Sequence, residues 1–201
     1  MPKVLIIDYG VGNLLSLECA LEKVGLQTEI GLSNQKLRTA DAIALPGVGN
    51  FSVAANKLSP FKQEIVDCAS GGIPIFGICL GLQLFFQESE EGPGEGLSLF
   101  VGKNNRLPNT VKVPHMGWNT LSIVKDTELL DGIENGSFMY FVHSLHPVPK
   151  DEAIICSKTD YGTTFTSAIA DKNVYGTQFH PEKSGDVGLK ILKNFAEIVS
   201  R

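Results

Sequence analysis

The sequence has 201 residues, of which 43% are hydrophobic and 19% are charged, and a formal net charge of −5. This length and composition predict one globular domain over residues 1–201. The negative charge, without any basic stripe, argues against a nucleic-acid-binding protein. The four cysteines are far apart and form no CxxC pair, which argues against a zinc site and a disulfide framework. We therefore expect no metal and no cofactor.

The N-terminal apolar stretch covers only residues 4–7 and is followed by Asp8. This stretch is too short for a secretion signal and far too short to span a membrane. We therefore expect no membrane association and a location in the reducing cytoplasm.

The first half of the sequence alternates short apolar runs with segments of helical periodicity. Such alternation is typical of a parallel sheet that helices cover on both faces. Asn13 is a suitable N-cap for the first helix, and Gly25 is a suitable residue to end that helix. Strands are predicted at 4–7, 42–45 and 73–78, and helices at 14–24, 60–70 and 80–88.

The second half contains short β-like runs separated by Pro, Gly and Asp turns, and it ends in an amphipathic helix. The turn at 171–173 indicates a hairpin. The strands are predicted at 139–142, 153–156, 166–170 and 174–179, and the helix at 187–198. We therefore expect a three-layer α/β fold, in which a mainly parallel central sheet is flanked by helices and extended by antiparallel strands.

Cys79 lies between Gly77 and Gly81, directly after a predicted strand and before a predicted helix. Glycines at these positions allow a sharp turn that exposes the side chain beside a backbone N–H, as in the serine nucleophile elbow. The N-terminus of a helix also favours the thiolate. Most free cysteines are simply buried core residues. Cys19, Cys68 and Cys156 lack this setting and are assigned to structure.

His180 follows a predicted strand about a hundred residues after Cys79, and Glu182 is two residues further on. Pro181 disfavours helix at His180 and so keeps this residue at the strand end. Active sites of open α/β sheets form beyond the carboxyl ends of the strands, where Cys79 is also expected. His180 is therefore the candidate base for Cys79, and Glu182 is the candidate carboxylate that orients it.

The segment Pro46-Gly47-Val48-Gly49 ends another strand at the same sheet edge. Alone it would be a plain turn. Beside a nucleophile, its backbone N–H groups become candidates for an oxyanion hole, together with the N–H of Leu80. Because glycine changes backbone conformation easily, we expect this hole to form only when a partner is bound.

These motifs together resemble the class I, triad-type glutamine amidotransferases, and the resemblance covers essentially the whole chain. It implies the flavodoxin-like fold of that family. It also implies that Cys79 attacks the side-chain amide of glutamine, while His180 and Glu182 complete the triad. The positions that match the family's oxyanion and glutamine-binding residues are Gly47, Val48, Gly49, Leu80, Gln83, His143 and Ser144. Leu145 departs from the family, which commonly has an aromatic residue there.

The segments 8–13, 114–119 and 180–184 further resemble the glutaminase subunits of imidazole glycerol phosphate synthases, in histidine biosynthesis. This resemblance implies a heterodimer in which ammonia passes to a separate (β/α)8-barrel cyclase subunit. Trp118 is expected in a turn-rich segment that contacts this partner. The positions implied at the interface are Asn13, His115, Met116, Trp118, Asn119, Tyr140 and Lys183.

Several alternatives remain open at this point. Asn13 has a rival role as a helix cap, and Trp118 and Tyr140 could instead belong to the core. The protein could supply ammonia to anthranilate, aminodeoxychorismate or pyridoxal phosphate synthesis, although the 115–119 segment argues against this. It could also be a stand-alone cysteine hydrolase or peptidase. A non-catalytic binding protein fits poorly, because nucleophile, base and orienting acid are all present.

Overall fold

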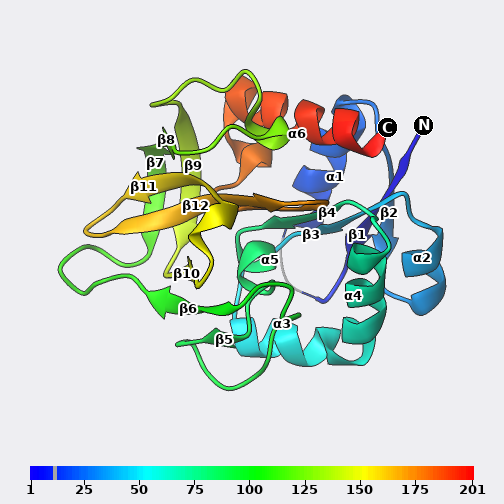
Figure 1. Cartoon of the computed structure of the whole chain (residues 1–201), viewed down its shortest axis with the longest axis horizontal. Helices are drawn as coiled ribbons and strands as arrows, with labels where there is room; N and C mark the ends of the chain where they lie inside the picture. Colours follow the sequence, from blue (N-terminus) through cyan, green and yellow to red (C-terminus); the bar gives the residue numbers. More distant parts are fainter. Residues whose placement is uncertain (11–12) are drawn as a thin grey trace.

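The computed structural model describes residues 1–10 and 13–201, so Val11 and Gly12 of the 8–13 segment lie outside the described residues. Its main sheet has eight strands in the order β2-β1-β3-β4-β13-β12-β11-β8 (Figure 1). These strands are β1 (Lys3–Ile7), β2 (Gln27–Gly31), β3 (Ala42–Leu45), β4 (Ile75–Ile78), β8 (Ser122–Ile123), β11 (Ile155–Asp160), β12 (Thr164–Asp171) and β13 (Val174–Thr177). The strands from β2 to β13 pair in parallel, and β12, β11 and β8 extend them antiparallel. The predicted mixed sheet is confirmed.

Helices cover both faces of this sheet (Figure 1). On one face lie α1 (Leu14–Lys23) and α6 (Gly185–Val199), and on the other lie α2 (Asn34–Thr39), α3 (Phe51–Leu58) and α4 (Lys62–Ser70). Side chains of β1 alternate between the two resulting cores: Val4 and Ile6 enter one, and Leu5 and Ile7 enter the other. This alternation follows from the two-residue period of a strand, and it confirms the three-layer architecture.

Two smaller sheets flank the antiparallel extension (Figure 1). One has the strand order β10-β6-β5, formed by β10 (Leu145–Pro149), β6 (Gly102–Arg106) and β5 (Glu88–Ser89). The other pairs β7 (His115–Thr120) with β9 (Phe138–His143) in antiparallel register, with Trp118 opposite Tyr140. The prediction that Trp118 lies in a turn-rich segment is therefore wrong, because pairing with β9 holds this segment as a strand.

The helix predicted at 80–88 is much shorter in the structure. Helix α5 (Leu80–Gln83) stops after four residues, and residues 88–89 form β5 instead. The backbone after α5 makes other hydrogen bonds. The carbonyl oxygen of Leu84 accepts from the N–H of Leu97, and the N–H of Gln87 donates to the carbonyl oxygen of Gly102. The buried Phe85 and Phe86 then anchor this turn in the core, so tertiary pairing replaces the helix.

The remaining predictions agree with the structure apart from small shifts at element ends. Asn13 caps α1 by accepting from the N–H of Ser16, and Lys172 makes the tight turn between β12 and β13. A 3-10 turn, η1 (Ser59–Phe61), precedes α4. The strand predicted at 153–156 begins only at Ile155, after η3 (Glu152–Ile154). A further 3-10 turn, η2 (Glu128–Leu130), precedes β9.

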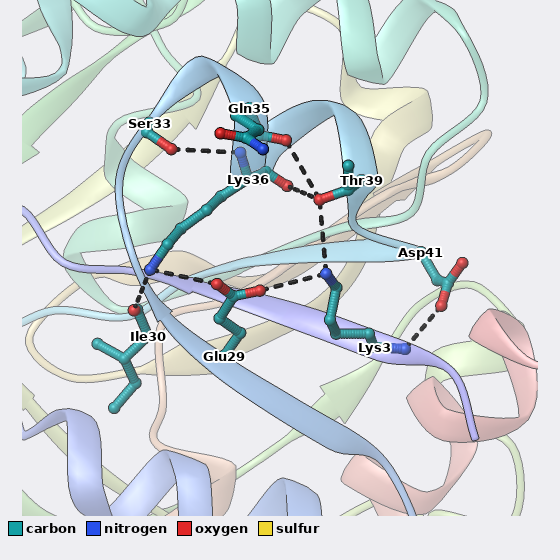
Figure 2. Close-up of polar contacts among 8 residues, drawn as sticks. All are labelled: Lys3, Glu29, Ile30, Ser33, Gln35, Lys36, Thr39 and Asp41. Atoms are coloured by element: carbon teal, nitrogen blue, oxygen red, sulfur yellow. Dashed lines mark hydrogen bonds and ion pairs between the residues drawn. The ribbon is translucent and has the colours of Figure 1, made fainter.

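A polar network fixes the outer edge of the sheet, far along the chain from Cys79 (Figure 2). Glu29 on β2 lies 3.2 Å from the ammonium of Lys3 on β1 and 3.2 Å from that of Lys36 on α2. Hydrogen bonds and attraction from these two lysines lower the pKa of Glu29. The network ties α2 to the edge strand β2 and to its neighbour β1, and exposed ion pairs of this kind add little stability.

Candidate active site

Cys79 occupies the sharp turn between β4 and α5, and it is one of few non-glycine residues with a positive φ, at 55°. Side chains are strained in this conformation, and such strain concentrates at functional sites. The flanking glycines serve close packing: a Cβ on Gly77 would lie 2.7 Å from the backbone of Gly81. A Cβ on Gly81 would lie 1.8 Å from the carbonyl oxygen of Leu45 at the end of β3. The Gly-x-Cys-x-Gly pattern therefore lets the elbow sit directly against the sheet.

His180 begins the turn η4 (Pro181–Lys183), three residues after β13 ends, and parallel pairing places β13 beside β4. Its Nδ1 donates to Oε1 of Glu182 at 2.7 Å, and the two side chains are only 3% and 6% exposed. Because Glu182 fixes the proton on Nδ1, the buried Nε2 is left to face the nucleophile. The arrangement is the one expected of a base held by a carboxylate.

The charge state of His180 is set by its neighbours. Burial alone lowers the pKa of His180, but attraction from the nearby Cys79 sulfur and the hydrogen bond with Glu182 outweigh burial and raise it to about 10. A raised imidazole pKa means that the proton is held firmly near neutral pH. The site therefore holds His180 as an imidazolium beside the sulfur, which is the counter-charge that an activated cysteine requires.

A cavity of about 190 Å³ opens beside the sulfur. It brings together seven residues singled out by sequence, namely Val48, Gly49, Cys79, Leu80, Gln83, His143 and Ser144. Gly47 is buried and does not line the cavity, but its carbonyl oxygen contacts the N–H of Leu80. Leu145, at the position that departs from the family, is also in the wall. Sequence reasoning missed Glu91, whose carboxylate joins this lining and accepts from the backbone N–H of Phe51 at the start of α3.

The expected oxyanion donors are not both free in this structure. The N–H of Leu80 donates to the carbonyl oxygen of Gly47 at 3.3 Å. The N–H of Leu80 must be free to donate before it can stabilise an oxyanion. The segment 46–49 would therefore have to turn its Gly47 carbonyl away before Leu80 could stabilise a charge in the cavity.

Two buried histidines form a directed chain of hydrogen bonds behind the cavity. His143 Nδ1 lies 2.8 Å from the carbonyl oxygen of Leu145, which can only accept, so Nδ1 carries the proton. His143 Nε2 then accepts from Nδ1 of His115 at 3.0 Å, and Nε2 of His115 accepts from Asn119 at 3.3 Å. Burial lowers the pKa of His143 to about 3 and that of His115 to about 4. Both rings are therefore neutral near pH 7.

The residues expected at a partner interface fall into two groups. Met116 and Trp118 on β7 are 63% and 56% exposed, and Tyr140 on β9 is half-buried beneath Trp118, with ring centroids 5.9 Å apart. His115 differs from the expectation, because it is 3% exposed and stacks on Tyr161, with ring centroids 3.9 Å apart. It supports the strand from behind and leaves almost no surface for a partner.

The other expected interface positions lie on three elements: Asn119 on β7, Lys183 in η4 and Asn13 at the start of α1. Asn13 is exposed, and Asn119 and Lys183 are half-buried. Strand β9 also contacts the catalytic segment directly. The backbone carbonyl oxygen of Tyr140 accepts from the N–H of His180 at 2.9 Å, and the backbone N–H of Tyr140 donates to Ser184 Oγ at 3.0 Å. The exposed strand surface is therefore one hydrogen bond away from the base.

Within residues 1–10 and 13–201, no group of three or more His, Cys, Asp and Glu side chains could hold a metal ion. In the same part of the chain, no helix is both long and apolar enough to cross a membrane.

Solved structures share this fold at low sequence identity. One is a protein of Thermoplasma acidophilum described as part of a GMP synthase, with a TM-score of 0.79 and 21% identity over 100% of this chain and 94% of that chain. Another is PurLQS from Thermotoga maritima, with a TM-score of 0.78 and 22% identity over 98% of this chain and 99% of that chain. At these identities the likeness supports the fold alone.

Sequence relatives are much closer. The family model described as glutamine amidotransferase class-I matches residues 5–199. The chain is 49% identical to imidazole glycerol phosphate synthase subunit HisH of Archaeoglobus fulgidus, over 98% of this chain and 100% of that protein. It is 47% identical to the subunit of the same name from Methanothermobacter thermautotrophicus, over 98% of each. The chain therefore belongs to the class I glutamine amidotransferases and, within them, to the family of the HisH subunits.

Proposed function

We propose that this protein hydrolyses glutamine to glutamate and ammonia through the triad Cys79, His180 and Glu182. The observation that carries the proposal is the strained elbow at Cys79, with a carboxylate-held histidine facing its sulfur. The family and its HisH relatives support the choice of glutamine over other amides.

The chemistry follows from the charge state of the pair. The Cys79 thiolate attacks the side-chain amide carbon of glutamine and gives a tetrahedral oxyanion. His180 donates its proton to the departing nitrogen, so ammonia leaves and a thioester remains. The now neutral His180 takes a proton from water, the hydroxide attacks the thioester, and glutamate and the thiolate are released. Glu182 keeps the imidazole oriented throughout.

The cavity lining supports recognition of an amino acid. Glu91 offers a carboxylate for the α-ammonium group of glutamine, and Gln83 offers a side-chain oxygen for the same group. His143 and Ser144 complete the wall opposite the expected oxyanion donors Val48, Gly49 and Leu80. These assignments account for most of the polar groups in the lining.

We further propose that the free subunit is held in a weakly active state. The Leu80 N–H that should stabilise the oxyanion is engaged by Gly47. A partner that moves the 46–49 segment would release this N–H and complete the hole. Such gating would prevent glutamine from being wasted while no acceptor for ammonia is present.

The proposed partner is a (β/α)8-barrel cyclase subunit that consumes the ammonia to make imidazole glycerol phosphate in histidine biosynthesis. The support is the HisH name of relatives that are matched over nearly their full length, together with the exposed Met116 and Trp118. Asn13, Asn119, Tyr140 and Lys183 would complete the interface of this heterodimer. A free nucleophilic thiol is consistent with the reducing cytoplasm.

Covalent labelling by a diazoketone analogue of glutamine tests the proposed activity in the isolated chain. We expect one adduct on Cys79, detected by peptide mass spectrometry and suppressed by excess glutamine. Cys79→Ala should abolish the adduct, while Cys19→Ser, a change at an exposed cysteine on α1, should leave it intact. Labelling of Cys79 that glutamine does not suppress would contradict the proposal.

A further inference from the structure

Gln178 is a fully buried polar residue that directly follows β13 and takes no part in the triad. Its side chain joins two parts of the site. The amide nitrogen lies 3.5 Å from the sulfur of Cys79, and the amide oxygen lies 3.1 Å from the amide nitrogen of Gln83. Burying a side-chain amide costs free energy unless its polar atoms are hydrogen-bonded, so these two contacts explain how an amide is tolerated here.

The direction of these hydrogen bonds is fixed by a backbone group. The Leu145 carbonyl oxygen can only accept, and it lies 3.0 Å from Nε2 of Gln83. The amide of Gln83 therefore presents its nitrogen to Leu145 and, with its second hydrogen, to Gln178. Gln178 must therefore accept this hydrogen bond with its side-chain oxygen, so its side-chain N–H groups point toward Cys79. The contact with the sulfur is thus a donor contact.

We propose that Gln178 stabilises the Cys79 thiolate by donating an N–H to the sulfur, with Gln83 and the Leu145 carbonyl holding its amide in this orientation. The inference rests on the proposed role of Cys79 as nucleophile, and it deepens that role. It also leaves only the side-chain oxygen of Gln83 for glutamine, since both hydrogens of its amide are engaged.

The other groups around the sulfur make this donor necessary. The carbonyl oxygen of Val142, 3.5 Å from the sulfur, can accept only from a neutral thiol and therefore favours the inactive form. His180 supplies the opposite charge. Tyr9 is a nearby buried phenol whose pKa burial raises, and the neutral His143 and the carboxylate of Glu91 line the same cavity as Cys79. Gln178 provides a neutral donor that strengthens when the sulfur becomes charged.

The test is the pH dependence of Cys79 alkylation by iodoacetamide in the full chain, followed by peptide mass spectrometry. Gln178→Met keeps the length of the side chain but removes the donor. Because a hydrogen bond to a charged group is lost, we expect the midpoint to rise by about one pH unit and alkylation below it to slow about tenfold. Thr177→Val is the matched control, because it removes a neighbouring buried hydrogen bond, to Phe179, that does not involve the sulfur.

Gln178→Glu is the second variant, because it keeps the oxygen that Gln83 requires and replaces the donor by another oxygen. We expect a larger upward shift than in Gln178→Met. Wild-type pH profiles in both variants would overturn the inference, as would an equal shift in Thr177→Val. Labelling by the diazoketone analogue reports the proposed function separately: a shifted alkylation profile without glutamine protection would uphold the role of Gln178 and reject glutamine as substrate.

Discussion

The Cα of Gly81 faces the carbonyl oxygen of Leu45 so closely that a Cβ at position 81 would lie 1.8 Å from that oxygen. This contact seats the first turn of α5 on the end of β3. It therefore fixes the direction of the backbone N–H of Leu80, because Leu80 lies between Cys79 and Gly81 in the sequence.

Gly81→Ala is expected to destabilise the fold and to disrupt the elbow. The added methyl meets backbone atoms that cannot move independently, and overpacking of this kind costs about 1–3 kcal/mol or more. Urea unfolding monitored by circular dichroism measures the loss. Gly71→Ala is the matched control, since its Cβ would meet its nearest atom only at 3.2 Å. Equal stability of the two variants would refute the assigned role of Gly81.

Glu182→Gln is expected to lower kcat for glutamine hydrolysis by about 10²–10⁴-fold. The charge that holds His180 would be gone, and the pKa of His180, now about 10, would fall. The imidazolium would then be lost at lower pH, so the alkaline limb of the activity profile should move down. Glu197→Gln, on the exposed face of α6, serves as control. An unchanged profile in Glu182→Gln would remove this carboxylate from the triad.

The free energy of unfolding is expected to fall as the pH decreases from about 6.5 to about 5. His115 and His143 stay neutral in the folded protein because their pKa values are lowered to about 4 and about 3, whereas the unfolded chain takes up protons below its ordinary histidine pKa. Their stabilising effect is therefore complete above that value and is lost on acidification. His180, with a raised pKa, contributes in the opposite direction and only at higher pH.

Urea unfolding at pH 7 and pH 5 measures this loss. His115→Gln should reduce the pH dependence, because one of the two buried neutral rings is removed. NMR titration provides a second readout, in which neither His115 nor His143 should change protonation between these pH values. A histidine that titrates normally at either position would show that the buried chain of hydrogen bonds does not hold in solution.

Trp118→Ala is expected to weaken binding of the cyclase subunit while leaving the isolated fold intact. Trp118 is 56% exposed and makes a T-shaped contact with Tyr140, and a tryptophan anchor contributes enough for a loss of about 30-fold or more in affinity. Calorimetric titration measures the change. Val101→Ala, on an exposed loop outside β7 and β9, should bind as wild type. Equal affinities would place the interface elsewhere.

The elbow at Cys79 and the turn that holds His180 beside Glu182 could be predicted because each rests on neighbouring residues. Gly77, Cys79 and Gly81 specify the turn, and His180-Pro181-Glu182 specify the strand end. The short α5 could not, because Leu84 and Gln87 exchange their helical hydrogen bonds for partners beyond residue 96. The same holds for the strand at Trp118, which depends on pairing with Tyr140.

The polar partners of the site were also beyond local patterns. Gln83 meets Leu145 at a separation of 62 residues and Gln178 at a separation of 95. Glu91 reaches the cavity only because the loop after β5 returns to the start of α3. The sequence shows Gln178 and Glu91 as ordinary polar positions, and the fold alone brings them to the site.

Glutamate release from glutamine, measured for this chain alone and with a cyclase subunit carrying its nucleotide ligand, tests the central claim most directly. Because the Leu80 N–H is hydrogen-bonded to Gly47, we predict almost no glutamate release by the chain alone and a strong increase in that rate in the complex. Full activity of the chain alone, unchanged by the cyclase, would contradict the gated, partner-dependent glutaminase and indicate a stand-alone amidase with the same triad.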